Sequence, residues 1–204
     1  MEQIKIAIPG LWPHFKLTQA LINYMKNFPD HINPNVTIGA VYGVFPYCIW
    51  DGGRVFYKMH QSSLEEIVEI RNYLKEQSIP LRLIFTNPIL QEEHFYDRFS
   101  NLICKTCEDE LNEIVVNNEN LEKYLREKYP KYSFISSTTK CQNLKASLQE
   151  LKNYKYVCLD YNQNHNSDLK NLAQEDKDKI EFLCNAICPP GCPNRKEHYK
   201  LNGI

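Results

Sequence analysis

The residues best suited to chemistry in this sequence are two cysteines and a histidine near its carboxyl end. Cys188 and Cys192 stand in a loop rich in proline and glycine, as a C-x3-C pattern, and His198 follows. Thiolates held on a short rigid loop can share one soft metal ion. The pattern is less specific than paired CxxC motifs, so a structural loop with incidental thiols stays an open alternative.

The other cysteines divide by their surroundings. Cys48 is set apart because it stands on a loop, beside two aromatic residues and a Gly-Gly-Arg turn. Cys104 and Cys107 lie one turn apart on an expected helix, and we interpret them as incidental, since a redox pair favours the start of a helix that follows a strand. Cys158 and Cys184 fall within strand-like runs, where a small buried side chain is the default.

The elements that must position these residues are short apolar runs separated by amphipathic stretches. Each run has the length of a buried strand, and several are nearly continuous hydrophobics, as in a parallel sheet covered by helices. The predicted strands are Ile4–Ile8, Val36–Tyr42, Leu81–Phe85, Glu113–Val116, Tyr132–Ser136, Tyr156–Leu159 and Ile180–Leu183. The predicted helices are Lys16–Asn27, Ser63–Gln77, Tyr96–Asp109, Leu121–Lys128, Cys141–Leu151 and Ser167–Lys177. Ser62 or Ser63, followed by Glu65 and Glu66, predicts a capping box.

This alternation predicts an α/β domain with parallel strands and right-handed crossovers. Seven strands in 204 residues give about 29 residues for each strand–helix unit, the size of one β/α unit. The turn at Pro9–His14 holds one glycine and no GxGxxG, which disfavours a doubly wound nucleotide-binding sheet. We therefore predict a TIM-type (β/α) barrel, incomplete with about seven parallel strands, as a single barrel-like domain over residues 1–204.

Chemistry in such barrels sits at the carboxyl ends of the strands, and polar residues follow each predicted strand. The predicted catalytic residues are His14, Asp51 and Asp160. The predicted substrate-binding residues are Trp12, Arg54, Lys140, Asn162 and Arg195. An aromatic ring can stack on a substrate ring, and the cations can bind an anionic group. Any one of these residues alone fits an ordinary loop or cap, but the repetition at successive strand ends favours a site.

Composition and motifs exclude several classes of protein. The 24 basic and 25 acidic residues give a net charge of −1, so no overall attraction to nucleic acid is expected. No run approaches the roughly 18–20 apolar residues of a membrane helix, and the start is not a secretory signal. We therefore expect a cytoplasmic protein with no membrane partner. No P-loop, GxGxxG, HExxH or GxSxG motif is present.

The order of segments resembles the collagenase-like peptidase family of unknown catalytic type, whose fold is a TIM-like barrel. The matching segments are Ile8–Gly10, Val41–Gly43, Ser137–Thr139, Asp160 with Asn162, and Ile180–Cys188. The last of these is the most specific, because it carries a Glu-to-Cys stretch on the seventh predicted strand. The resemblance covers nearly the whole chain as an order of segments, although each motif is short.

The resemblance implies a 4Fe-4S cluster, since members linked to hydroxylation of ubiquinone and RNA hold one on four cysteines. By this likeness Cys48 matches the early ligand, Cys188 matches the ligand of the seventh strand, and Cys192 is a third. Cys184 and His198 are candidates for the fourth, because imidazole can replace thiolate at an iron–sulfur site. Zinc on the same loop is the alternative.

Three functions follow from these observations. The first is an iron–sulfur or metal-binding protein that modifies RNA or a small aromatic molecule, for example by hydroxylation. The second is a metal-dependent or peptidase-like hydrolase, which would need a nucleophile and base or a metal-bound water. The third is a non-catalytic subunit, in which a homo-oligomer or another partner covers the open edge of the barrel.

Overall fold

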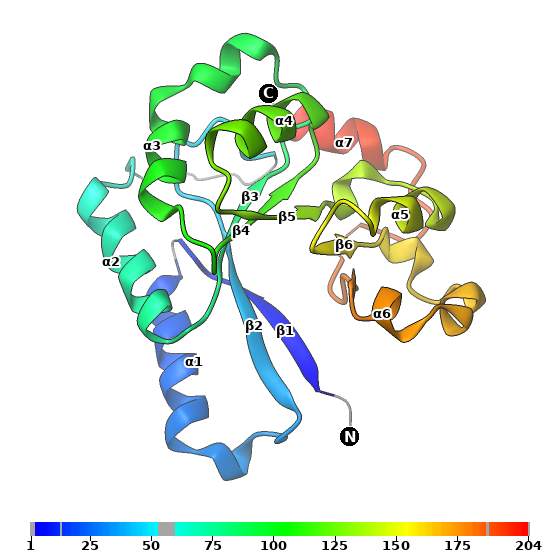
Figure 1. Cartoon of the computed structure of the whole chain (residues 1–204), viewed down its shortest axis with the longest axis horizontal. Coiled ribbons are helices and arrows are strands. Elements are labelled where there is room, and N and C mark those ends of the chain that lie inside the picture. Colours follow the sequence, from blue (N-terminus) through cyan, green and yellow to red (C-terminus); the bar gives the residue numbers. More distant parts are fainter. Residues whose placement is uncertain (1–2, 13, 53–59, 187, 204) are drawn as a thin grey trace.

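A single all-parallel sheet organises the molecule. The computed structural model describes residues 3–12, 14–52, 60–186 and 188–203. Its seven strands lie side by side in the order of the chain (Figure 1). The strands are β1 (Ile4–Pro9), β2 (Val36–Gly43), β3 (Leu81–Phe85), β4 (Glu113–Val116), β5 (Ser133–Ser136), β6 (Tyr156–Cys158) and β7 (Ile180–Glu181). All seven predicted strands are therefore confirmed, and β7 is shorter than predicted.

The sheet is curled into a half-barrel. An ion-pair network on its concave side shows that the curl brings side chains of distant strands into contact. Arg82 of β3 donates two hydrogen bonds of 2.8 Å to Glu181 of β7, although three strands lie between them. The same guanidinium donates to Glu113 of β4 at 2.7 Å, and Lys155 approaches Glu113 at 2.8 Å. Burial lowers the pKa of Arg82, but the two carboxylates outweigh it and leave that pKa raised. Arg82 thus stays charged and bridges the strands across the curl.

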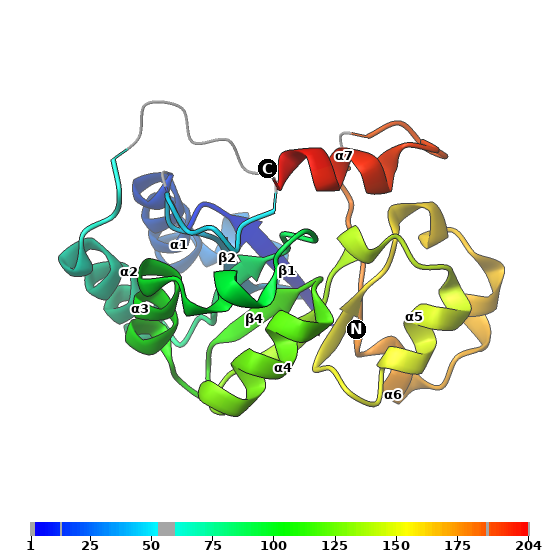
Figure 2. The ribbon, with the colours of Figure 1, turned by 90° about the horizontal axis from the view of Figure 1, so that it is seen from above.

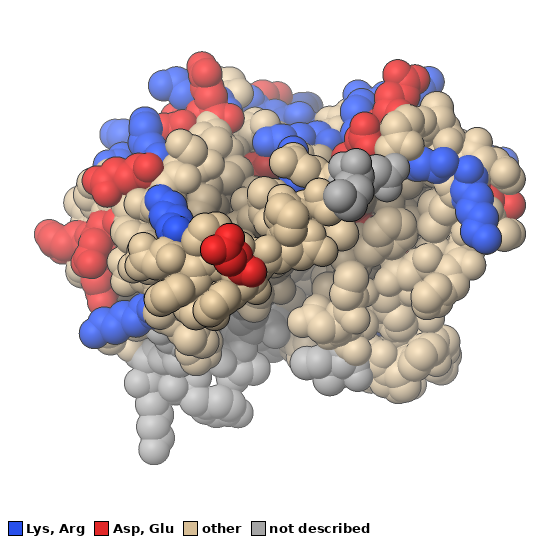
Figure 3. All heavy atoms as spheres, turned by 90° about the horizontal axis from the view of Figure 1, so that it is seen from below, with Lys and Arg blue, Asp and Glu red and all other residues tan. Residues whose placement is uncertain are grey.

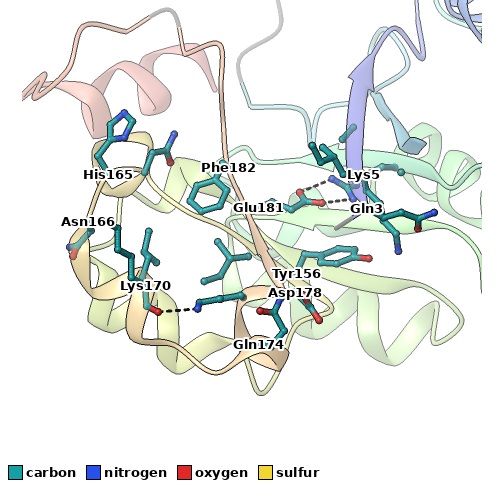
Figure 4. Close-up of a pocket in the computed structure, with 18 residues that line it drawn as sticks. Gln3, Lys5, Tyr156, His165, Asn166, Lys170, Gln174, Asp178, Glu181 and Phe182 are labelled. Carbon is teal, nitrogen blue, oxygen red and sulfur yellow. Dashed lines mark hydrogen bonds and ion pairs between the residues drawn. The ribbon is translucent and has the colours of Figure 1, made fainter. Parts of the chain in front are cut away.

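The half-barrel does not close between β1 and β7. A cavity of about 1200 Å³ separates these two strands, with Gln3 to Lys5 on one side and Ile180 to Phe182 on the other (Figure 4). The prediction of an α/β fold with seven parallel strands is confirmed. A TIM-type barrel is not confirmed, because the sheet has two free edge strands among the residues that the structure describes.

Helices lie between successive strands, as β/α units require, and one more follows the last strand. They are α1 (Phe15–Asn27), α2 (Leu64–Glu76), α3 (Arg98–Cys107), α4 (Glu119–Lys128), α5 (Leu144–Glu150), α6 (Gln174–Lys177) and α7 (Arg195–Asn202). Short 3-10 turns lie at η1 (Pro29–His31), η2 (Glu92–Tyr96), η3 (Thr138–Lys140), η4 (Tyr161–Gln163) and η5 (Ser167–Asn171). The stretch predicted as one helix, Ser167–Lys177, is instead η5 followed by α6. Extended backbone at Leu172 and Ala173 separates the two.

Local sequence explains where α2 begins and which face it buries. The Ser63 hydroxyl accepts from the Glu66 amide and the Glu66 carboxylate accepts from the Ser63 amide, which is the capping box. Ile67, Ile70 and Leu74 recur at helical spacing and are buried. They belong to one continuous core that also contains the inward side chains of β3 and β4. No described helix is long and apolar enough to cross a membrane.

Candidate metal site at the carboxyl edge of the sheet

Helix α7 crosses the carboxyl edge of the sheet and is fixed at both ends (Figure 2). At its start, Arg195 donates to Asp160, which follows β6, at 2.5 Å. At its end, the Gly203 carbonyl accepts from the Asn87 side chain, which follows β3, at 3.0 Å. The same Asn87 amide also donates to the Ile49 carbonyl, so the loops after β2 and β3 share one anchor with α7. The helix therefore spans the edge where chemistry is expected in a β/α fold.

The loop before α7 is a tight turn that brings two cysteines together. The Cys192 amide donates to the Pro189 carbonyl at 3.2 Å, and Gly191 between them has a φ of +72°. Pro190 and that glycine occupy the two central positions, as in a type II turn. The turn is held to η4, because the Gly191 amide donates to Asn162 and the Tyr161 hydroxyl donates to the Pro189 carbonyl.

This turn and the first turn of α7 bring together a constellation of side chains that could hold a metal ion. The Sγ atoms of Cys188 and Cys192 and a ring nitrogen of His198 all lie within 4.8 Å of one another. The two cysteines are half-buried and the histidine is exposed. Two soft sulfur donors and one imidazole suit zinc and related transition metals. Residues predicted as metal ligands from the sequence are thus brought together.

Arg195 is the first residue of α7, and its donors are used by the protein. Its side chain is buried and donates to Asp160, Thr138 and the Tyr199 hydroxyl. The Tyr161 ring lies 4.1 Å from its guanidinium carbon. These contacts make Arg195 a structural cation that joins α7 to the ends of β5 and β6, and its part in substrate binding stays a prediction.

Removal of this cation is expected to destabilise the protein strongly. The Arg195→Met variant leaves the buried Asp160 carboxylate without its partner, which costs about 3–5 kcal/mol. Urea denaturation measures this loss. The matched control is Lys200→Met on the same helix, whose pair with Glu197 is exposed and contributes at most about 1 kcal/mol. Equal losses in the two variants would contradict the role given to Arg195.

The structure does not bring Cys48 into the metal constellation. Its side chain is buried in the core, and its sulfur lies 3.3 Å from the Ser100 hydroxyl of α3. Burial raises the pKa of this thiol to about 12, so it is protonated at neutral pH. Cys48 packs as a small apolar residue, and the loop that carries it folds inward because Trp50 is fully buried two residues later.

The remaining predicted site residues are dispersed or engaged elsewhere. Asp160 accepts from Asn162 as well as from Arg195, so it positions the loop and is not free as a base. Lys140 donates to Glu150 at 2.8 Å and to the Tyr154 hydroxyl at 3.1 Å. Both side chains are thus engaged within the protein, and the catalytic role of Asp160 and the substrate-binding role of Lys140 stay predictions.

Among the described residues, His14 and Asp51 do not belong to the group of close metal-ligating side chains. His14 is exposed at the start of α1, and Trp12 lies against His60 with ring centroids 5.6 Å apart. The buried Trp12 indole nitrogen has no hydrogen-bond partner among the described residues. Asp51 is half-buried beside the Cys48 loop. Arg54 lies outside the described residues.

The sequence did not predict helix α7 or the contact of Tyr161 with the Cys188–Cys192 turn, which we call the metal loop. Asn194 and Gly203, which flank the helix, are typical start and stop residues. They did not lead to a predicted helix because the whole segment was interpreted as a loop. Tyr161 carries no motif, and its role depends on η4, which brings its hydroxyl to Pro189.

The charges on the surface agree with the near-neutral composition. On the face shown in Figure 3, basic and acidic side chains both occur in small groups and neither forms a continuous field. This arrangement gives no electrostatic support for an RNA substrate on that face. Comparison with family models, with curated proteins and with solved structures finds no match to this chain.

Proposed function

We propose that this protein binds one zinc ion through Cys188, Cys192 and His198 and uses it for metal-assisted hydrolysis. The observation that carries the proposal is the approach of the three donor atoms to within 4.8 Å of one another. Tetrahedral zinc, with bonds of about 2.0–2.3 Å, requires donors roughly 3.5–3.8 Å apart. Small side-chain rotations from the present positions reach that spacing.

The donor set favours a single ion over a 4Fe-4S cluster. A cluster is held by ligands on separate iron atoms, which have to lie farther apart than the ligands of one ion. The cysteine expected to supply the early ligand, Cys48, is instead packed against Ser100. The constellation contains two thiols and one imidazole, a combination found at zinc sites.

The number of ligands and their exposure favour catalysis over a purely structural ion. Structural zinc sites normally have four protein ligands, whereas catalytic sites have three and leave a position open. Zinc at an open position lowers the pKa of a bound water toward neutrality. The location at the carboxyl edge of the strands is the one that a TIM-type relationship predicts. In this chain Tyr161, Asn162 and Arg195 hold the metal loop in place.

The proposal is tested by titration with Co²⁺, whose thiolate charge-transfer absorption reports sulfur ligation directly, and by competition with Zn²⁺. We expect one ion per chain. Cys192→Ser or His198→Ala should lower the affinity by about 100-fold or more, because each removes a ligand. Hydrolysis of an activated ester, p-nitrophenyl acetate, should depend on the bound zinc.

Matched controls are Cys184→Ser and His165→Ala, which remove the same residue types outside the constellation and should leave affinity unchanged. Equal losses of affinity in the control and ligand variants would refute the ligand set. Binding without ester hydrolysis would retain the ion and overturn the catalytic part. A protein that assembles iron and sulfide in place of one ion would overturn the choice of metal.

A further inference from the structure

Helix α1 carries an exposed row of large apolar side chains. The exposed fractions are 71% for Leu17, 39% for Leu21, 43% for Tyr24 and 48% for Phe28, which caps the helix. Single exposed apolar residues are ordinary, but these four recur at intervals of four, three and four residues and share one side of the helix. This spacing is that of a helix-pairing seam. We call these four residues the α1 seam.

The α1 seam faces neither the core nor the neighbouring helix. The core side of α1 is formed by Phe15, Thr18 and Ile22, which are buried. The side toward α2 is marked by Asn23, which accepts from the Tyr73 hydroxyl, and by Lys26, which donates to Gln77. The seam lies on the remaining side of the helix. His31 of η1 covers one end of the seam in part, since its ring stacks on Phe28 with centroids 5.5 Å apart and its Nδ1 is hydrogen-bonded to the Tyr24 hydroxyl at 2.9 Å. All four seam side chains nevertheless keep the exposed fractions given above.

The pattern of the α1 seam is complementary to itself. The intervals of four, three and four residues read the same in both directions, so an antiparallel second helix has matching positions. Such a pairing places Leu17 opposite Phe28 of the second copy and Leu21 opposite Tyr24 of the second copy. Each aliphatic side chain then meets an aromatic one, which fills the interface better than pairing large rings with each other.

Charges also favour this antiparallel arrangement. The first turn of α1 contains Lys16 and no acidic residue, and Asp30 follows the helix in η1. Antiparallel pairing brings Lys16 of one copy toward Asp30 of the other at both ends. Lys26, the one charged residue between Leu17 and Phe28, is turned toward α2 and does not enter the seam. Opposed helix dipoles add to the preference.

We propose that two copies of this protein associate through the α1 seam, with their α1 helices antiparallel about a two-fold axis. The interface is isologous and closes on itself, which yields a dimer and no larger assembly. One helix of 13 residues covers less than the about 800 Å² per partner of a standard interface. The dissociation constant is therefore expected in the range of roughly 1–100 μM.

Sedimentation velocity over a concentration series spanning that range tests the proposal. The wild-type protein should shift from monomer to dimer, and Leu21→Glu should weaken association at least about 10-fold. Each copy in the dimer then buries one charged side chain at the centre of the seam, which is unfavourable. Leu102→Glu on α3 is the matched control, since Leu102 has the same exposed fraction of 39% and lies outside the seam.

These experiments test dimerisation through the α1 seam independently of the zinc proposal, because the metal loop and the α1 seam share no residue. Circular dichroism of both variants verifies that they fold, as expected for substitutions at exposed positions. A wild-type protein that stays monomeric throughout the series overturns the proposal and leaves the seam to a different partner helix. A dimer weakened equally by both substitutions places the interface elsewhere and also overturns it.

Discussion

Alkylation with iodoacetamide near pH 8 is expected to divide the cysteines into two classes whose rates differ by about a thousandfold. The slow class contains Cys48, Cys107 and Cys158, where burial raises the pKa of each thiol from 9.0 to about 12. The thiolate is the nucleophile, so a rise of about three pKa units lowers its population about 1000-fold at this pH. The fast class contains the exposed Cys184. Mass spectrometry of each cysteine peptide over time measures the individual rates.

The same experiment with zinc present locates the metal on the chain. Zinc should protect Cys188 and Cys192 and leave Cys184 as reactive as before. Cys184 is an internal control because it precedes Cys188 by four residues and lies outside the constellation. Rapid labelling of Cys48 would show that its loop opens readily and would return it to the ligand candidates. Protection of Cys184 together with the other two would point to a larger site than proposed.

The strands could be predicted from the sequence because each is a short apolar run between polar stretches. Leu81–Phe85 and Glu113–Val116 match β3 and β4 in both bounds. A strand buried on both sides must be apolar nearly throughout, so its pattern depends little on the rest of the fold. The curl of the sheet, in contrast, could not be predicted from such local patterns. It depends on Arg82 of β3 meeting Glu181 of β7, a contact between residues 99 positions apart.

The candidate site could be predicted where its residues are close in sequence. It could not be predicted where the role of a residue depends on whether the fold buries it. Cys188, Cys192 and His198 are joined by one turn and one helix, so local geometry is sufficient to bring them together. The loop position of Cys48 was predicted, but its burial depends on the packing of Trp50 against Phe85, with ring centroids 5.2 Å apart. Likewise, the charge of Arg195 suggested a ligand, whereas its partner Asp160 makes it structural.

Stability is expected to fall steeply above pH 9, because three cysteines are buried near one another. Cys48, Cys104 and Cys107 are fully buried, and burial raises the pKa of each. In the unfolded chain these thiols ionise near pH 9, while in the folded protein they stay protonated. A folded-state pKa above the unfolded value gives stability that is complete below pH 9 and is lost as pH rises toward the folded value.

The expected loss is a large fraction of the stability of a domain. For Cys48 and Cys107 together, the free energy of unfolding should decrease by about 3 kcal/mol between pH 8 and pH 10, since each group contributes about 1.4 kcal/mol per pH unit once its unfolded form is ionised. Cys104 and Cys158 add to this, because burial raises the pKa of these thiols as well. Urea denaturation under reducing conditions at both pH values measures the change.

The Cys107→Ala variant isolates the contribution of one thiol from the titration of tyrosines and lysines over the same interval. Its free energy of unfolding at pH 8 should be lower than that of the wild type, because a buried sulfur is lost from the core. Its further loss between pH 8 and pH 10 should be smaller by about 1.4 kcal/mol, since one proton fewer is released on unfolding. An identical loss in both proteins would show that Cys107 ionises in the folded state, which requires water to reach the interior at the end of α3.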